Sequence, residues 1–308
     1  MRNFLVEAPN IDFLKIRKLG YLFSFLLLVM SLTLFFTKGF NLGLDFTGGT
    51  SIQIKFNQPI KISDVRPLLK DVNLDDAVIQ EVGTEKKEIE IRVPIKKGSS
   101  STIVESVKKA LDTKYKGQYE IRKIEFIDAL VGSEMAKASI YSMIFVFIGI
   151  LLFVGYRYEP LFAIAGVIPL FHDAIITLGI FSLLGREIDL TVIAAILTVL
   201  GYSLNDTIIV FDRIRENIQQ RGKKNLESII NRSINENLGR TIITSGTVIL
   251  SVLAMYFFGG ESLNSFALAI FIGVIFGTYS SIYVAAPLIL DVENLLRSRV
   301  KKEQVSGV

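Results

Sequence analysis

The chain has 308 residues, 50% of them hydrophobic, and its 34 Lys and Arg against 30 Asp and Glu give a net charge of +4. It contains no Cys and one His, which excludes disulfides, thiol nucleophiles and metal sites built from cysteine or histidine clusters. No cofactor or metal is therefore predicted. The positive charge does not predict nucleic-acid binding, because the cations stand beside apolar segments, where they set membrane topology.

Apolar runs long enough to cross a bilayer dominate the sequence. A run of about 18 or more apolar residues is typical of a transmembrane helix. Six such runs lie at 19–36, 138–156, 161–184, 188–211, 241–258 and 264–290. The first follows three cations, as a secretory signal would, but Phe35 to Lys38 does not resemble a small-residue cleavage site, so we predict an uncleaved anchor. The predicted fold class is a polytopic α-helical membrane protein with six transmembrane helices.

A glycine-rich segment, GLDFTGGT from Gly43 to Thr50, separates the first run from the first predicted strand. Gly48 and Gly49 allow a tight turn or the close approach of another backbone. A phosphate-binding loop is a second interpretation, although no predicted helix follows the glycines as such loops require. With Gly43 and Asp45, these glycines are the notable positions of the segment.

Residues 37–136 are polar and charged, and they predict one small α+β domain outside the membrane. Alternating apolar residues predict strands at 50–56, 77–82, 88–93 and 119–127, and two helical patterns lie between them, the first capped by Ser63. The order β-α-β-β-α-β is typical of a ferredoxin-like domain. It contains no hydrolase, metalloprotease or P-loop motif, so we predict a binding or mechanical domain and no enzyme.

Ionisable side chains inside the predicted spans are the main candidates for function, because a charge within the bilayer is costly. The candidates, with their polar neighbours, are His172 and Asp173 in the third span, Asn205 and Asp206 in the fourth, and Arg240 and Thr244 at the start of the fifth. Their helical spacing makes polar stripes, which we expect to face each other or water. Gly273 and Gly277 in the sixth span have the spacing of close helix contacts.

Asp206 is the predicted centre of a proton relay. A carboxylate whose surroundings alternate between apolar and cationic can take up and release a proton. Arg240 is the predicted cation, because arginine keeps its charge and can approach or leave the carboxylate. Asp173 and His172 are candidates for the same relay. A purely structural tie between helices is the alternative for all of these buried charges.

Positive charge gathers on one set of short loops, which predicts the orientation. The opposite loops hold Arg186 with Glu187, Asp189 and Glu261. The cations of the first set are Lys15, Arg17, Lys18, Arg157, Arg213, Arg215, Arg221, Lys223, Lys224, Arg232, Arg297, Arg299, Lys301 and Lys302. We therefore expect both termini in the cytoplasm and the polar domain on the other side.

The domain boundaries follow from these spans. We predict a cytoplasmic N-terminal segment at 1–18, the first span at 19–36, the outer domain at 37–136, five spans within 137–292 and a cytoplasmic tail at 293–308. Within the five-span part, the basic cytoplasmic segment 213–237 is mildly amphipathic, which predicts a helix lying along the membrane surface. A plain topology anchor is the alternative.

Several of these segments resemble the SecD/SecF family of bacterial protein-export subunits. Gly43 to Thr50 resembles the motif that follows the family's first span. His172 to Gly179 resembles its third span, and Arg240 to Thr247 resembles its fifth. Gly201 to Asn217, beginning GYSLNDT, resembles the fourth-span signature of the SecF branch and differs from the sequence that is usual at this place in SecD.

The resemblance implies half of an RND-type transporter in the bacterial inner membrane. Such a subunit is expected to pair with SecD, to associate with the SecYEG channel and YajC, and to help unfolded polypeptide cross the membrane at the expense of the proton-motive force. It implies that Asp206 titrates protons, with Arg240 as its charged partner and Thr244 as a polar contact. A scaffold without proton conduction and an exporter half for a small lipophilic solute are the alternative functions.

Overall fold

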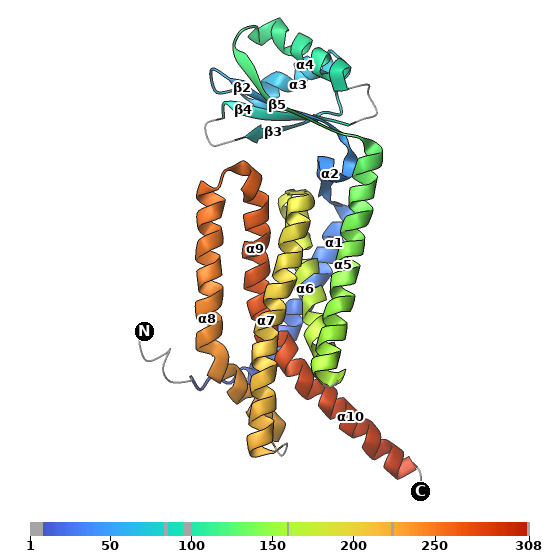
Figure 1. Cartoon of the computed structure of the whole chain (residues 1–308), viewed down its shortest axis with the longest axis vertical. Coiled ribbons are helices and arrows are strands. Elements are labelled where there is room, and N and C mark those ends of the chain that lie inside the picture. Colours follow the sequence, from blue (N-terminus) through green and yellow to red (C-terminus); the bar gives the residue numbers. More distant parts are fainter. Residues whose placement is uncertain (1–8, 83–85, 95–99, 159, 223–224, 307–308) are drawn as a thin grey trace.

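The computed structural model describes residues 9–82, 86–94, 100–158, 160–222 and 225–306. Residues 1–8 of the predicted N-terminal segment lie outside this range, as do Lys223 and Lys224 of the predicted cytoplasmic segment. The described chain forms a bundle of long helices with a small sheet domain at one end (Figure 1).

Six helical segments of the described chain are long and apolar enough to cross a membrane, as predicted. They are built from α1 (Arg17–Thr37), α5 (Ala129–Arg157), α6 (Pro160–Leu184), α7 (Leu190–Arg221), α8 (Leu226–Phe258) and α9 (Glu261–Ser280), which continues through a π-helical turn, Ser281–Ala285, into α10 (Ala286–Ser306). The spans containing α6, α7 and α9 are the most buried, while α1, α5 and α8 expose most of their surface. The ionisable candidates on α6 and α7 therefore lie on central helices.

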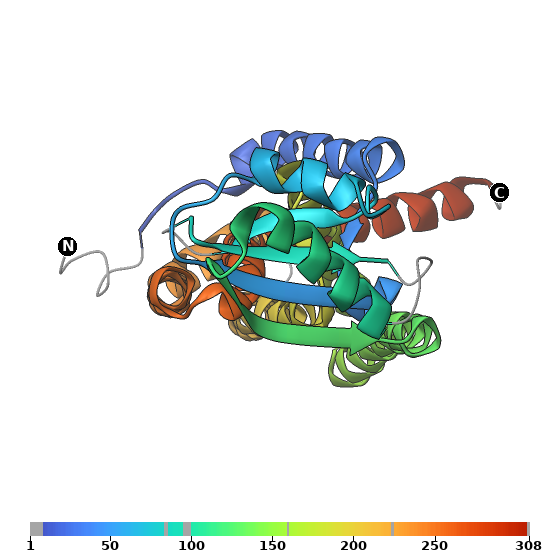
Figure 2. The same ribbon diagram turned by 90° about the horizontal axis from the view of Figure 1, so that it is seen from above.

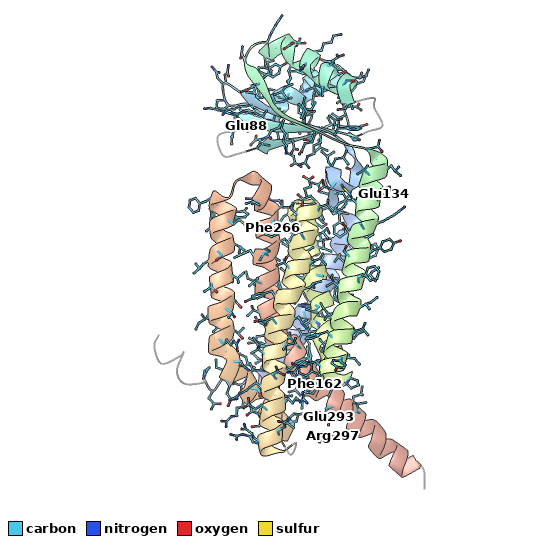
Figure 3. All side chains as sticks on the ribbon, viewed as in Figure 1. Glu88, Glu134, Phe162, Phe266, Glu293 and Arg297 are labelled. Atoms are coloured by element: carbon cyan, nitrogen blue, oxygen red, sulfur yellow. The ribbon has the colours of Figure 1, made fainter. Side chains whose placement is uncertain are left out.

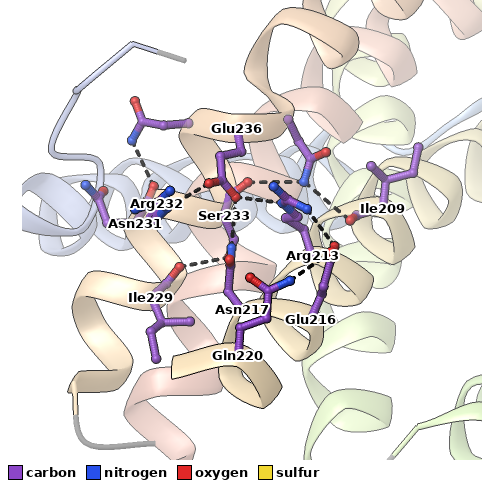
Figure 4. Close-up of polar contacts among 12 residues, drawn as sticks. Ile209, Arg213, Glu216, Asn217, Gln220, Ile229, Asn231, Arg232, Ser233 and Glu236 are labelled. Carbon is purple, nitrogen blue, oxygen red and sulfur yellow. Dashed lines mark hydrogen bonds and ion pairs between the residues drawn. The ribbon is translucent and has the colours of Figure 1, made fainter. Parts of the chain in front are cut away.

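Segment 213–237 differs from the prediction of one helix along the membrane surface. It forms the last turns of α7 and the first turns of α8, which lie side by side at the end of the bundle away from the sheet domain (Figures 1 and 4). A helix of 32 residues is about 48 Å long, which exceeds the roughly 30 Å hydrocarbon core, so α7 continues out of the bilayer.

A network around Glu236 holds these two helix ends together. Its carboxylate accepts hydrogen bonds from Arg213 at 2.6 Å, Asn217 at 2.9 Å and Arg232 at 2.7 Å, and Arg213 also pairs with Glu216 at 2.6 Å (Figure 4). The polar faces of α7 and α8 thus satisfy each other. This pairing is the physical reason why the amphipathic pattern did not produce a surface helix.

The outer domain has the predicted β-α-β-β-α-β order. Its elements are β2 (Gly49–Phe56), α3 (Ile62–Lys70), β3 (Val78–Val82), β4 (Glu88–Val93), α4 (Ser100–Tyr115) and β5 (Tyr119–Ile127). The strands form an antiparallel sheet in the order β3-β4-β2-β5, which is the ferredoxin-like arrangement. Ser63 is not the N-cap of α3, because the helix begins at Ile62, one residue before Ser63, and Lys61 is at the N-cap.

Both helices of the outer domain lie over the face of the sheet that points away from the bundle (Figures 1 and 2). The core between them contains Ile52, Ile54, Ile89 and Ile91, all completely buried. Burying one such side chain stabilises the fold by about 1.5–3 kcal/mol. The opposite, polar face of the sheet is therefore turned toward the membrane bundle.

Candidate functional site

Asp206 lies inside the bundle, and its carboxylate has no hydrogen-bond partner among the described residues. Its side chain is on α7 and is 1% exposed. Within the described ranges, neither carboxylate oxygen accepts a hydrogen bond, and the hydroxyl of the adjacent Thr207 is also buried without a partner. A lone buried charge of this kind is costly, and an arriving proton or cation removes that cost.

Asp206 sits at a depth that corresponds to the membrane interior. It comes 16 residues after Leu190, the first residue of α7, which places it about 24 Å along the helix. The hydrocarbon core of a bilayer is about 30 Å thick. Arg240 comes 18 residues before Phe258, the last residue of α8, and so lies about 27 Å from the same end of the bundle.

Arg240 and Thr244 lie on α8, which packs beside α7. Arg240 is exposed, and within the described part of the chain no ion pair joins it to Asp206. The Thr244 hydroxyl donates to the carbonyls of Arg240 and Thr241, at 3.0 and 3.1 Å, and not to Asp206. The structure thus brings the predicted partners to neighbouring helices without direct contact.

A chain of hydroxyl groups connects α7 to α8 and α9 near this carboxylate. Tyr202 donates to Ser245 at 3.0 Å, and Ser245 shares a hydrogen bond of 2.7 Å with Thr278. Asn205, the other polar position of the fourth-span stripe, is exposed. Tyr202 of this stripe therefore contacts a neighbouring helix, whereas Asn205 points away from the helix contacts.

Asp173 is buried as deeply as Asp206, but both oxygens of its carboxylate have polar partners. Its carboxylate accepts hydrogen bonds from Ser203 on α7 at 2.6 Å and from Ser280 on α9 at 2.9 Å. The Nδ1 atom of His172 lies 2.9 Å from the other oxygen, while its Nε2 atom is buried and has no partner in the part of the chain that the structure describes. Asp173 consequently ties three central helices together, which its sequence position alone did not reveal.

Close backbone contact allows this tie between α7 and α9. A Cβ atom added to Gly273 would lie 2.4 Å from both γ-carbons of Val199, and one added to Gly277 would lie 3.0 Å from the Cβ of Ser203. Ser280 follows on the same helix, directly before the π-helical turn. π-helical turns often occur at functional sites, and here the turn begins where α9 reaches Asp173.

The glycine-rich segment joins the first span to the start of α7. The Gly43 amide donates to the Ile188 carbonyl at 2.8 Å, within a short parallel pairing of β1 (Asn41–Leu42) with β6 (Glu187–Ile188). The carboxylate of Asp45 accepts from the Leu190 amide at 2.9 Å. Asp45 therefore satisfies an unpaired amide in the first turn of the helix that carries Asp206.

Gly48 and Gly49 supply the close backbone approach that the sequence predicted. Both have positive φ angles, of 65° and 138°. A Cβ atom on Gly49 would lie 2.6 Å from the carbonyl oxygen of Val93 in β4. These positions turn the chain into the outer domain, which agrees with the structural interpretation of the two glycines.

An ion pair that the sequence did not indicate connects the outer domain to the bundle. Arg92 of β4 pairs with Glu187, the residue that begins β6, and with Glu90 at 2.7 Å. Arg92 and Glu187 are 95 positions apart, so no local pattern marks them as partners. The start of α7 is thus held both by the glycine-rich segment and by the sheet.

Comparisons with known proteins agree with these features. The family model "Protein export membrane protein SecD/SecF, C-terminal" matches residues 106–295, and the "SecD/SecF GG Motif" model matches residues 33–60. The chain belongs to the SecD/SecF family. The first match contains Asp173, Asp206 and Arg240, and the second contains the glycine-rich segment.

Named relatives in the SecD/SecF family share most of their length with this chain. Protein translocase subunit SecF of Haemophilus influenzae is 43% identical over 299 residues, which cover 96% of this chain and 91% of that protein. Protein translocase subunit SecF of Desulfurispirillum indicum is 44% identical over 286 residues, covering 91% of each chain. The predicted resemblance is confirmed.

Two solved SecDF structures of the SecD/SecF family share the fold. SecDF of Thermus thermophilus, a translocon-associated membrane protein, matches with a TM-score of 0.84 and 34% identity, over 93% of this chain and 39% of SecDF. A SecDF structure in a super-membrane-facing form matches with a TM-score of 0.66 and 32% identity, over 98% of this chain and 41% of SecDF. This chain therefore spans about two fifths of the length of either SecDF chain.

Proposed function

We propose that this chain is a subunit of the bacterial protein-export machinery that works with SecD and uses the proton-motive force to promote polypeptide translocation. Its relatives are named protein translocase subunits, and the matching SecDF structure is described as translocon-associated. The observation that supports proton use is the unpartnered carboxylate of Asp206 in the bundle interior. Intramembrane ionisable groups commonly mark ion pathways.

In the proposed mechanism, Asp206 alternates between a protonated state and a state paired with Arg240. A proton removes the cost of the lone carboxylate charge, and an approach of Arg240 removes the same cost when the proton leaves. Each charge that crosses 100 mV supplies about 2.3 kcal/mol. Movement of α8 against α7 would then accompany each proton.

The outer domain is proposed to respond through α7. The first residues of this helix contact Asp45, and the strand before it carries the Arg92–Glu187 ion pair. A shift of α7 is therefore passed to the sheet, which we propose acts on unfolded polypeptide. Asp173, whose hydrogen bonds are complete, is proposed to hold the central helices while α8 moves.

A partner subunit is proposed to cover the exposed face of α8. Arg240 is exposed at a depth within the membrane, and an arginine there is costly against lipid. Pairing with SecD would supply that cover, and association with the SecYEG channel and YajC completes the proposed complex. The proposed location is the inner membrane, with both termini in the cytoplasm.

The test is proton flux and export in vesicles that contain this chain with SecD and the SecYEG channel. Asp206→Asn keeps the shape of the side chain and is expected to abolish flux and to slow export. Asp212→Asn is the matched control, because Asp212 is a carboxylate on the same helix that already accepts a hydrogen bond from Tyr158 at 2.7 Å. It is expected to leave flux unchanged.

Two results would overturn the relay. Wild-type vesicles without proton flux would indicate a scaffold in which the buried charges are ties. Flux that Asp206→Asn leaves at the level of the Asp212→Asn control would move the relay away from Asp206.

A further inference from the structure

A cavity lies at the end of the bundle opposite the outer domain. Its volume is about 420 Å³. The cavity is lined by residues from the end of α5, the start of α6, the C-terminal turns of α7, the start of α8, and α10. Phe162 and Glu293, two of the lining residues, lie at this end of the bundle in Figure 3.

Two arginines give the cavity its charge. Arg157 and Arg215 line it, and no hydrogen bond or ion pair engages either guanidinium within the described part of the chain. Arg157 lies 5.8 Å from the centre of the Tyr158 ring. Glu293 is the acidic lining residue, and Arg297 already pairs with it at 3.0 Å.

Both positive charges act on one point of the cavity wall. Burial and the hydrogen bond to Asp212 raise the pKa of the Tyr158 hydroxyl, while the charges of Arg157 and Arg215 lower it. The two guanidinium groups therefore both interact electrostatically with the Tyr158 hydroxyl. An anion between them would meet positive charge from α5 and from α7.

The cavity lies at the level of the membrane surface. Arg215 comes 25 residues after Leu190, about 38 Å along α7, so a helix that enters at one surface of a bilayer about 40–45 Å thick carries Arg215 to the headgroups of the other surface. Arg157 is the last residue of α5. The charged wall is thus placed where lipid phosphates lie.

Apolar surface leads from the cavity toward the membrane interior. Leu161 and Phe162 line the cavity itself. On the preceding turns of α5, Leu152 is 67% exposed and Phe153 is 53% exposed. Acyl chains can follow this surface while a headgroup occupies the cavity.

We propose that this cavity binds the phosphate headgroup of an anionic phospholipid between Arg157 and Arg215. The charge complementarity selects an anion, and the adjoining apolar surface of α5 selects a lipid over free phosphate. Basic pockets between membrane helices at the membrane surface are suited to such headgroups. The proposal does not depend on proton transfer at Asp206.

The experiment measures lipid binding to the purified full-length chain in detergent by native mass spectrometry. The probes are phosphatidylglycerol, phosphatidylcholine and inorganic phosphate. The variant is Arg157→Gln with Arg215→Gln, and the control is Arg221→Gln, which removes an exposed cation at the end of α7 that does not line the cavity. Gel filtration and thermal unfolding confirm that each variant is folded.

The wild type is expected to retain phosphatidylglycerol in preference to phosphatidylcholine, and the double variant is expected to bind phosphatidylglycerol about tenfold more weakly. The control should bind as the wild type does. Equal binding of both lipids, or equal losses in the double variant and the control, would overturn the proposal. Displacement of phosphatidylglycerol by millimolar inorganic phosphate would also overturn it, because the site would then select phosphate and not lipid.

Discussion

Replacement of Gly273 by alanine is expected to separate α9 from α7 and to disturb the burial of Asp206. The new Cβ would lie 2.4 Å from both γ-carbons of Val199 and 2.9 Å from its Cβ, far inside ordinary contact distance. Val199, Ser203 and Asp206 are spaced by four and three residues, so they share one face of α7. Movement of α9 off this face therefore reaches the carboxylate.

The size of the effect follows from two opposed terms. Alanine in place of glycine inside a helix gains about 1 kcal/mol, while overpacking of a filled contact costs about 1–3 kcal/mol. Gly246→Ala in α8 is the matched control, because nothing lies within 4 Å of its added Cβ. The difference between the two variants isolates the overpacking and is expected to be about 1–3 kcal/mol.

The assay is thermal unfolding of the purified chain, together with proton flux in the vesicles described above. Gly273→Ala should unfold at a lower temperature than Gly246→Ala and should show reduced flux. Val199→Ala in the same chain removes both γ-carbons and should recover part of the stability. The reasoning fails if Gly273→Ala is as stable as Gly246→Ala, or if Val199→Ala recovers nothing.

Three further predictions follow from the contacts described above. Asp173→Asn should lower the free energy of unfolding by about 1–3 kcal/mol, because an amide cannot accept all the hydrogen bonds that the carboxylate accepts. The proton flux per folded molecule should not change. Loss of flux at wild-type stability would contradict a purely structural role for Asp173. Gly49→Ala should increase protease cleavage of the outer domain, because its φ is 138° and the added Cβ meets the Val93 carbonyl; wild-type resistance would contradict this. Burial and the hydrogen bond to Asp112 raise the pKa of the Tyr119 hydroxyl to about 12. The protonated hydroxyl therefore contributes to the free energy of unfolding below pH 10, and this contribution is lost as the pH rises through 12. An ultraviolet titration that gives Tyr119 its ordinary pKa of 10.0 would refute this prediction.

The spans and the outer domain could be predicted from the sequence because their signals are local. A bilayer-long apolar run has no stable soluble alternative, and strict alternation in segments such as 50–56 predicts strands without knowledge of their neighbours. The polar stripe of the fourth span predicted correctly that Asp206 points into the bundle. These conclusions need only the period of the chain and the cost of exposing a side chain to the wrong solvent.

The tertiary structure decided how polar groups find partners. The amphipathic segment 213–237 fits a membrane surface or another helix equally well, and only the position of Glu236 between α7 and α8 decides between them. The ion pair of Arg92 with Glu187 likewise joins positions that no sequence period relates.

Asp173 and Asp206 show the same division most clearly. Both are acidic residues within long apolar runs, and the sequence marks both as costly to bury. Ser203 and Ser280 reach Asp173 from α7 and α9, whereas Asp206 meets no donor within the described chain. Burial is a property of each helix face and can be predicted from the sequence, but a hydrogen bond depends on the relative placement of two helices to within a few tenths of an ångström, which only the packed bundle sets.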